Sequence, residues 1–212
     1  MSLRSHLKQA LKRNLSPSLV QRLQTAHNVW RALCPRRFQR VLFRADRLPE
    51  EDVGDLDVEI VEPRMPVSDM QRAFITRDTP DFSLWRLMWW QRRGHAWIFF
   101  ARNAGEYCHY TWVTPACRTR RVFPIVRERD ALLIGPCSTD SRFRGRSIYP
   151  RMLRHTVQTM QLRGYGPFYI STSVTNEASI RGISKAGFTR CGVWAGASAL
   201  CGHCALTRRV AD

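Results

Sequence analysis

The sequence predicts a mixed α/β fold, in which helices flank a sheet of antiparallel and parallel strands and a basic helical segment precedes the sheet. Three observations predict this fold. The chain has 212 residues, a length that suits one domain with an appendage. Its residues are 44% hydrophobic and include ten Phe and seven Trp, enough for a large core. Predicted strands dominate the first half, and strands alternate with helices in the second.

The amino-terminal segment is the most basic part of the chain. Residues 1–45 contain ten Arg or Lys and no Asp or Glu. Apolar residues recur at helical spacing on both sides of Ser16–Pro17, a pair suited to a helix start. We therefore predict a basic amphipathic helical segment at 1–37 and one domain at 38–212. The helices are expected to pack on the domain; peripheral contact with an anionic membrane and an organelle transit peptide are the alternatives.

The first half of the domain is predicted to hold strands and helices in the order 41–45, 58–61, 68–76, 82–93, 96–102 and 106–113. Runs of β-branched and aromatic residues predict the strands. Nearby prolines bound the first helix, and Trp and Leu side chains gathered on one side predict the second. Asn103-Ala104-Gly105 separates the last two strands and predicts a hairpin.

The second half is predicted to hold strands 121–126 and 131–137, helix 149–162, strand 168–174, a short helix ending near Lys185, and strands 190–194 and 197–206. The succession of strand, loop, helix, strand and helix indicates that part of the sheet is parallel. Antiparallel strands before it make the sheet mixed.

Composition narrows the function classes. The net charge is +17, and only three of the 34 basic residues are lysine. Because guanidinium groups suit phosphate and carboxylate, we expect an anionic ligand or surface, although arginine-rich codon usage gives the same composition. No apolar run approaches the roughly 18 residues of a membrane-spanning helix. Seven cysteines without a secretory signal indicate a reducing compartment, so a cytoplasmic protein is expected.

The segment Cys201-Gly-His-Cys204 has the spacing of a redox dithiol and contains three metal-binding groups. It lies between two apolar stretches instead of opening a helix, and no second Cys-x-x-Cys completes a zinc site. We therefore expect two unpaired thiols in a terminal hairpin and no metal.

A loop between a predicted strand and a predicted helix gathers positive charge. Residues 138–147, here called the arginine loop, carry three arginines and Gly145, and Pro150 lies in the first turn of the next helix. Free N–H groups at a helix N-terminus, a close backbone approach at glycine and guanidinium groups all favour an anion. The loop is predicted to bind phosphate; a basic surface turn is the alternative. Its glycine spacing matches neither a dinucleotide-binding loop nor a Walker loop.

A second motif follows 31 residues after Gly145, running from Asn176 to Gly187-Phe188. Together the two motifs resemble the GNAT superfamily of acyl-CoA-dependent N-acyltransferases. In that family a strand leads into an Arg-Gly-x-Gly-Ile-Gly loop and a helix, to which residues 144–153 correspond. The next strand, an asparagine-headed helix and Gly-Phe correspond to residues 168–188. The resemblance covers about residues 95–194.

The resemblance implies a splayed mixed sheet whose gap takes the pantetheine arm of acyl-CoA like an extra strand, with the pyrophosphate on the loop at 142–149. The implied activity moves an acyl group, most simply from acetyl-CoA, to a primary amine of a small molecule such as an amino sugar, without a metal. The residues predicted to contact the cosubstrate are Thr139, Arg142, Arg144, Gly145, Arg146, Ser147, Ile148, Tyr149, Asn176 and Ser179.

The catalytic groups are predicted less directly. His109 lies on the strand that the resemblance places beside the gap, and an unperturbed pKa of about 6.5 suits a general base; Glu106 is the alternative. Many family members carry a tyrosine at the position of Ile183, which protonates the leaving thiolate. Because isoleucine cannot do so, the candidate acids are Tyr149 and Tyr169, and unassisted departure or lost catalysis is the alternative.

Ser147 and Tyr149 replace two glycines of the family pattern. Together with Ile183 and the basic segment, these departures support a different function. In that reading a non-enzymatic basic module with a degenerate acyltransferase domain binds nucleic acid or an anionic membrane. A steep salt dependence of nucleic-acid binding would identify it. Of the two functions, we expect the chain to be the acyltransferase, and we do not expect nucleic acid to be a partner.

Overall fold

The computed structural model describes residues 36–48, 54, 56–77, 81–119, 123–199 and 204–211. The predicted helices of the basic segment lie outside the described residues, as do Cys201 and His203 of the Cys-x-x-Cys segment. The first described strand begins at Arg36.

Within the described ranges, eight strands form one sheet in the order β2-β3-β4-β5-β6-β1-β7-β8. Their bounds are β1 Arg36–Ala45, β2 Asp57–Val61, β3 Trp97–Asn103, β4 Glu106–Pro115, β5 Leu132–Thr139, β6 Phe168–Ser173, β7 Thr189–Ala199 and β8 Cys204–Ala211. Strands β5 and β6 are parallel, and the other neighbouring pairs are antiparallel. The sheet is therefore mixed, as predicted.

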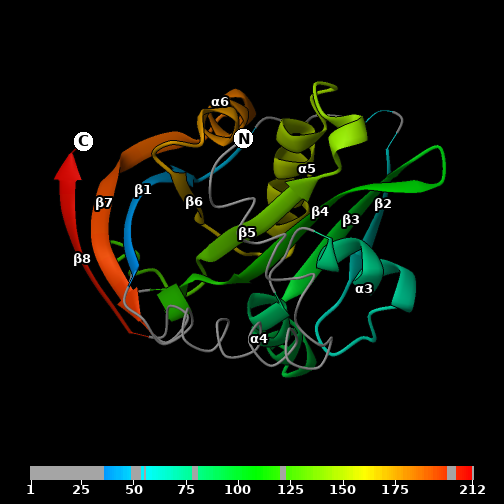
Figure 1. Ribbon diagram of the computed structural model, residues 1–212, viewed down its shortest axis with the longest axis horizontal. Helices are drawn as coiled ribbons and strands as arrows, with labels where there is room; N and C mark the ends of the chain where they lie inside the picture. Colours follow the sequence, from blue (N-terminus) through cyan, green and yellow to red (C-terminus); the bar gives the residue numbers. More distant parts are fainter. Residues whose placement is uncertain are drawn as a thin grey trace, which may run out of the picture.

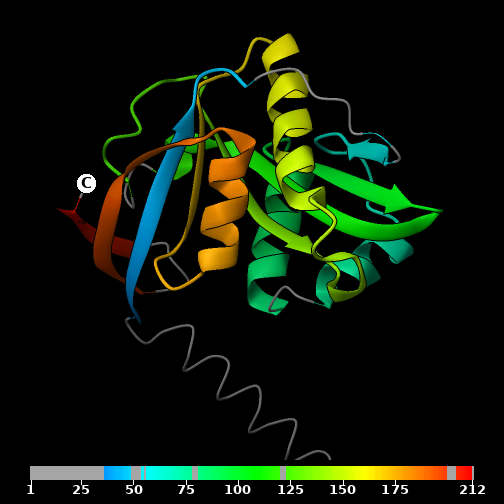
Figure 2. The same ribbon diagram turned by 90° about the horizontal axis from the view of Figure 1, so that it is seen from above.

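The helices cover both faces of the sheet (Figures 1 and 2). They are α3 Asp69–Thr76, α4 Asp81–Arg92, α5 Ile148–Leu162 and α6 Glu177–Ala186, with short 3-10 turns η1 Ala116–Thr119 and η2 Ser141–Phe143. Figure 1 shows α5 and α6 above the sheet and α3 and α4 below it. No helix in the described part of the chain is long and apolar enough to cross a membrane.

The alternation of side chains along β3 divides the core into two layers. Trp97 and Phe99 belong to the core on the α5 side, whereas Ile98 and Phe100 pack with α3 and α4. Since cross-strand partners share a face, Thr111 of β4, opposite Phe99, also faces α5.

A third apolar cluster covers the face of the sheet opposite α6. Part of it comes from the segment 121–126, for which the prediction of a strand is wrong. The described residues of this segment, 123–126, form a turn. Phe123 and Val126 are buried and pack with Trp194, which explains why the segment is apolar without being a strand. Pro124 has no N–H for a sheet ladder, which also disfavours a strand.

The terminal hairpin is confirmed, with different bounds. β7 and β8 pair antiparallel from Val193 opposite Ala211 to Ala199 opposite Cys204. The predicted strand 197–206 is therefore split: residues 197–199 end β7, and Cys204 starts β8.

Candidate functional site

The parallel strands β5 and β6 separate after a short contact. Their pairing runs from Leu132 opposite Phe168 to Ile134 opposite Ile170. β5 then continues beside β4 to Thr139, while β6 continues beside β1 to Ser173. The two strands thus diverge into a gap whose narrow end, the vertex, lies at Ile134 and Ile170. This geometry confirms the splayed sheet.

The arginine loop connects the end of β5 to α5 at the wide end of this gap. Asp140 caps the short turn η2, where its carboxylate accepts a hydrogen bond from the backbone N–H of Arg142 at 3.0 Å. Gly145 has a φ of +80° with open space around the site of a Cβ, so its backbone conformation alone favours glycine.

The start of α5 leaves donors available for an anion. Ser147 is the N-cap and its side chain makes no capping hydrogen bond. The first N–H groups of a helix have no acceptor within the helix, and Pro150 carries none, so the N–H groups of Ile148 and Tyr149 are the helical donors there. Ser147 has a φ of +56°, a left-handed conformation, and its hydroxyl accepts a hydrogen bond from Lys185 Nζ of α6 at 2.8 Å.

The three arginines of the loop differ in their surroundings. Arg142 forms ion pairs with Glu106 at 2.9 Å and with Asp140 at 3.1 Å. Arg144 Nε donates to the backbone carbonyl of Thr139 at 3.1 Å, and Arg146 lies over the Phe143 ring. Carboxylates already balance Arg142, so Arg144 and Arg146 are the better placed of the three to meet a phosphate.

Asn176 and Ser179 open α6 on the other side of the gap. The side-chain oxygen of Asn176 accepts the N–H of Ser179 at 3.1 Å and caps the helix. Asn176 therefore has a structural role that follows from its position alone.

Tyr149 reaches from the first turn of α5 to α6. Its ring packs on Gly182 so closely that a Cβ there would lie 2.6 Å from the ring. Its hydroxyl is hydrogen-bonded to Ser179, and burial, with Cys137 nearby, raises the pKa of the phenol. Ser179 lies one helical turn before Ile183, so both face the same side of α6. The Tyr149 hydroxyl thus lies on the side of α6 where the family pattern expects an acid.

His109 is fully buried beneath the wide end of the gap. Hydrogen bonds join its Nδ1 to Thr139 Oγ1 at 2.7 Å and its Nε2 to Thr111 Oγ1 at 2.8 Å. Burial lowers the pKa of His109 to about 3, so the imidazole is neutral at pH 7. His109 lies four residues along β4 from Val113, which pairs with Ile134 at the vertex, so it is roughly 13 Å from the vertex at about 3.3 Å per residue of strand. This geometry favours a positioning role; the base role stays a prediction.

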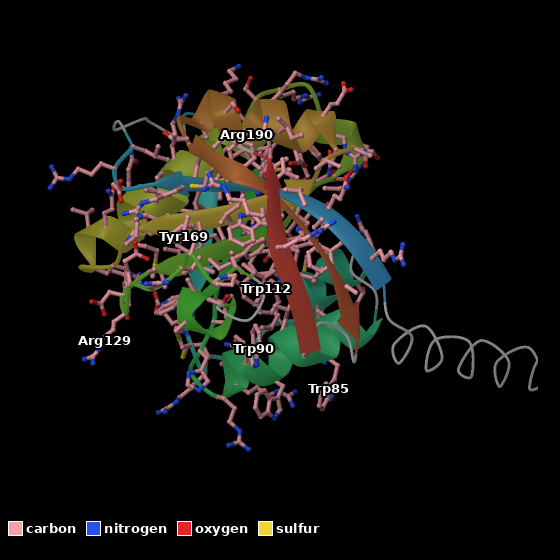
Figure 3. All side chains as sticks on the ribbon, turned by 90° about the vertical axis from the view of Figure 1, so that its left-hand side faces the viewer. Trp85, Trp90, Trp112, Arg129, Tyr169 and Arg190 are labelled. Carbon is pink, nitrogen blue, oxygen red and sulfur yellow. The ribbon has the colours of Figure 1, made fainter. Side chains whose placement is uncertain are left out.

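The side chains of the other two catalytic candidates have partners outside the gap. Glu106 lies at the hairpin turn, where it is exposed and forms an ion pair with Arg142. Tyr169 faces away from α5 and α6 (Figure 3), and its hydroxyl contacts Glu128 at 3.1 Å and Arg44 at 3.1 Å. Burial raises the pKa of Tyr169 to about 12. The structure therefore does not bring Tyr169 to Ile183.

Three residues of the site were missed by the sequence analysis. Asp140 could have been found, because Asp commonly accepts the N–H two residues ahead in a turn. Lys185 and Gly182 had no such signal, since their contacts with Ser147 and Tyr149 join separate helices.

No protein-family model matches the sequence, and no curated protein matches it significantly. Solved structures are similar in fold at low identity. A GNAT-family acetyltransferase from Colwellia psychrerythraea is 17% identical with a TM-score of 0.53, over 76% of this chain and 55% of that one. A protein assigned to the same family from Novosphingobium aromaticivorans is 16% identical with a TM-score of 0.55, over 82% and 66%. The chain thus spans between about half and two thirds of these two proteins.

A third similar structure is the GCN5-related glucosamine N-acetyltransferase region of a fungal multi-domain β-N-acetylglucosaminidase. It is 12% identical with a TM-score of 0.56, over 82% of this chain and 22% of that one. The strand order, the gap between β5 and β6 and the similar solved structures all indicate the same fold. The chain has the fold of the GNAT superfamily of acetyltransferases.

Proposed function

We propose that the protein is an acyl-CoA-dependent N-acyltransferase acting on a primary amine of a small molecule. The supporting observation is the gap between β5 and β6 with the arginine loop at its wide end. Beyond Ile134 and Ile170, neither strand pairs with the other within the described sheet. The amides of a pantetheine arm can bond to these backbone edges, while Arg144, Arg146 and the start of α5 receive the pyrophosphate.

The acceptor attacks the thioester directly in this proposal. The neutral amine bonds to the carbonyl carbon, the carbon–sulfur bond breaks, the nitrogen loses a proton and the sulfur gains one. Backbone N–H groups along the open edge of β5 can donate to the oxyanion. Burial raises the pKa of the Cys137 thiol to about 12, so this cysteine is protonated and is a poor nucleophile. No acyl-cysteine is needed.

Tyr149 is the proposed proton donor to the sulfur. Its raised pKa keeps the phenol protonated at neutral pH, and its contact with Ser179 holds the hydroxyl on the side of α6 that carries Ile183. His109 lies too far from the vertex for direct contact with the amine, so a proton would reach it only through water. We therefore propose that water accepts the amine proton first.

Calorimetry with acetyl-CoA on the full chain tests the binding half of this proposal. A screen of amines that reads released thiol tests the transfer half. Glucosamine is a suitable first acceptor because the fungal region with the same fold is described as a glucosamine N-acetyltransferase. Arg144→Ala/Arg146→Ala is the control that separates specific cosubstrate binding from binding to other basic surfaces.

The outcomes separate the two functions considered for the chain. Acetyl-CoA binding with amine-dependent thiol release supports the enzyme. Absence of acetyl-CoA binding would overturn the proposal. Steeply salt-dependent nucleic-acid binding in the same preparation would favour the non-enzymatic basic module.

A further inference from the structure

Helix α4 carries apolar side chains on both of its sides. Leu84, Leu87 and Met88 are buried and pack in the core layer below the sheet. Trp85 and Trp89, by contrast, are 63% and 41% exposed. The sequence prediction that the Trp and Leu side chains gather on one side of this helix is therefore wrong. The buried side holds α4 on the domain, and the two indole rings face solvent.

The two exposed tryptophans form one patch with neighbouring arginines. Residues four apart in a helix lie on the same face, so Trp85 and Trp89 are neighbours. Arg92 and Arg93 follow one turn after Trp89 and continue this face, and both are exposed. The Arg93 guanidinium lies over the Trp89 ring, 5.2 Å from its centroid. These four residues are called the α4 patch below.

The surroundings of the α4 patch along the chain are positively charged. No acidic residue occurs from Phe82 to His95, a stretch that contains three arginines. Arg64 adds a guanidinium at the end of the helix, where its Nε lies 2.9 Å from the position that a Cβ on Gly94 would take. The patch therefore combines aromatic surface with a charge that attracts anions.

The structural roles of such residues account for only part of the α4 patch. Arginines in the last turn of a helix complement its dipole, and single exposed apolar side chains are common. Indole rings, however, are large and usually keep most of their apolar surface away from water. Trp97, Trp112 and Trp194 follow this rule, since each is at most 8% exposed. Two exposed indoles one helical turn apart indicate a partner that covers both.

An anionic membrane surface fits this chemistry best. Indole rings favour the interface between headgroups and acyl chains, and arginines bind lipid phosphates. A second copy of the chain is disfavoured, because two facing patches would bring Arg92 and Arg93 of both copies together. Single-stranded nucleic acid also stacks on aromatic rings, but its binding sites are positively charged grooves, whereas these rings lie on the exposed side of a helix.

We propose that the α4 patch docks the protein on an anionic membrane surface. Trp85 and Trp89 enter the headgroup region, while Arg92 and Arg93 contact lipid phosphates. The helix lies along the surface, with its buried side still packed on the domain. This docking requires neither acyl transfer nor the basic segment at 1–37.

Vesicle cosedimentation of the full chain tests the docking. The vesicles are phosphatidylcholine with about one third phosphatidylserine, in a low-salt buffer. Wild-type protein should bind, and Trp85→Gln/Trp89→Gln should lower the partition coefficient at least tenfold, because the apolar anchor is lost. Leu162→Gln is the matched control and should leave binding unchanged. Leu162 is 91% exposed and lies on α5, on the other side of the sheet (Figure 1).

The arginines of the α4 patch provide a second, independent pair of variants. Arg92→Gln/Arg93→Gln should weaken vesicle binding at least tenfold at low salt and much less at high salt. Arg181→Gln/Arg190→Gln removes the same charge from exposed positions of α6 and β7 and should weaken binding less than threefold. Figure 3 shows Arg190 and Trp85 at opposite ends of the view. These variants decide the question even if the tryptophan variant misfolds.

Intrinsic fluorescence identifies the rings that enter the bilayer. Lipids with brominated acyl chains quench the tryptophans that they contact, so quenching at saturating lipid should fall at least threefold in Trp85→Gln/Trp89→Gln. Trp30→Gln, in the basic segment, is the matched control and should keep most of the quenching.

The outcomes separate the α4 patch from other partners and other parts of the chain. Unchanged vesicle binding in both the tryptophan and the arginine variants would overturn the proposal and favour the basic segment. Absence of wild-type vesicle binding would also overturn it. In that case, oligonucleotide binding or a concentration-dependent dimer, lost in the tryptophan variant, would identify nucleic acid or a second copy as the partner. None of these measurements needs acyl transfer, so their failure is distinct from failure of the proposed function.

Discussion

The buried imidazole of His109 makes a quantitative prediction about acid stability. In the unfolded chain a histidine titrates near pKa 6.5, whereas burial lowers the pKa of His109 in the folded protein to about 3. Between these values the unfolded state binds the extra proton, so the free energy of unfolding falls as pH falls. From pH 7.5 to pH 5 this linkage amounts to about 2 kcal/mol.

The substitution His109→Gln removes the titration while keeping an amide that can bond to Thr139 or Thr111. Urea unfolding of both proteins at pH 7.5, 6.5 and 5 should show that the wild type loses about 2 kcal/mol more than the variant. His155→Gln is the matched control, because His155 is only partly buried although burial also lowers its pKa. Its effect on the pH profile should be smaller.

The same variant separates positioning from catalysis. We expect His109→Gln to change kcat less than tenfold, because His109 lies far from the vertex of the gap. A general base would lower kcat by about 100-fold or more and would remove the acidic limb of the kcat/KM profile. Parallel stability profiles for the two proteins, together with such a kinetic loss, would refute the assignment of His109 as a buried neutral group.

Three further predictions concern the arginine loop and α6. Replacing Arg144 and Arg146 together by Ala should weaken acetyl-CoA binding more than tenfold in calorimetry. Arg142→Ala should weaken this binding less, because Glu106 and Asp140 already form ion pairs with Arg142. Equal losses of affinity would contradict this ranking. Gly182→Ala should lower stability by about 1–2 kcal/mol, since overpacking against Tyr149 exceeds the gain of about 1 kcal/mol in helix propensity. When Tyr149 is also replaced by Ala, Gly182→Ala should instead stabilise the protein, because the clash is gone. Thermal unfolding of the single and the double variant measures both effects. Tyr149→Phe should lower kcat at least tenfold with acetyl-CoA but not with an aryl thioester, whose thiolate needs no acid; equal losses would exclude the donor role.

Local patterns predicted the elements that local physics determines. The hairpin at 103–105 and the helix start near Pro150 each depend on a few adjacent residues, and both are present. The strand predicted at 121–126 was wrong because the apolar residues there hold a turn against the sheet. A short apolar run does not distinguish a strand from a buried loop.

The parts that were not predicted depend on residues distant in sequence. Alternation along β4 gives the face on which His109 lies, but its burial and its low pKa depend on Thr139 and on Tyr149 of α5, which packs against its ring. The contact of Tyr149 with Gly182 joins two helices. The same holds for Arg40 and Ser171, which lie 131 residues apart. No spacing rule relates such residues.

The place of β1 in the sheet has a consequence for how the chain is made. β1 leaves the ribosome before its two neighbours in the sheet, β6 and β7, because β2 to β5 lie between them in the chain. Until then Val41, Leu42 and Phe43 stand in a segment with two open edges, which is a risk for aggregation. The four arginines of β1, at positions 36, 37, 40 and 44, flank this apolar run, and repulsion between their charges disfavours pairing of two unfolded copies through β1.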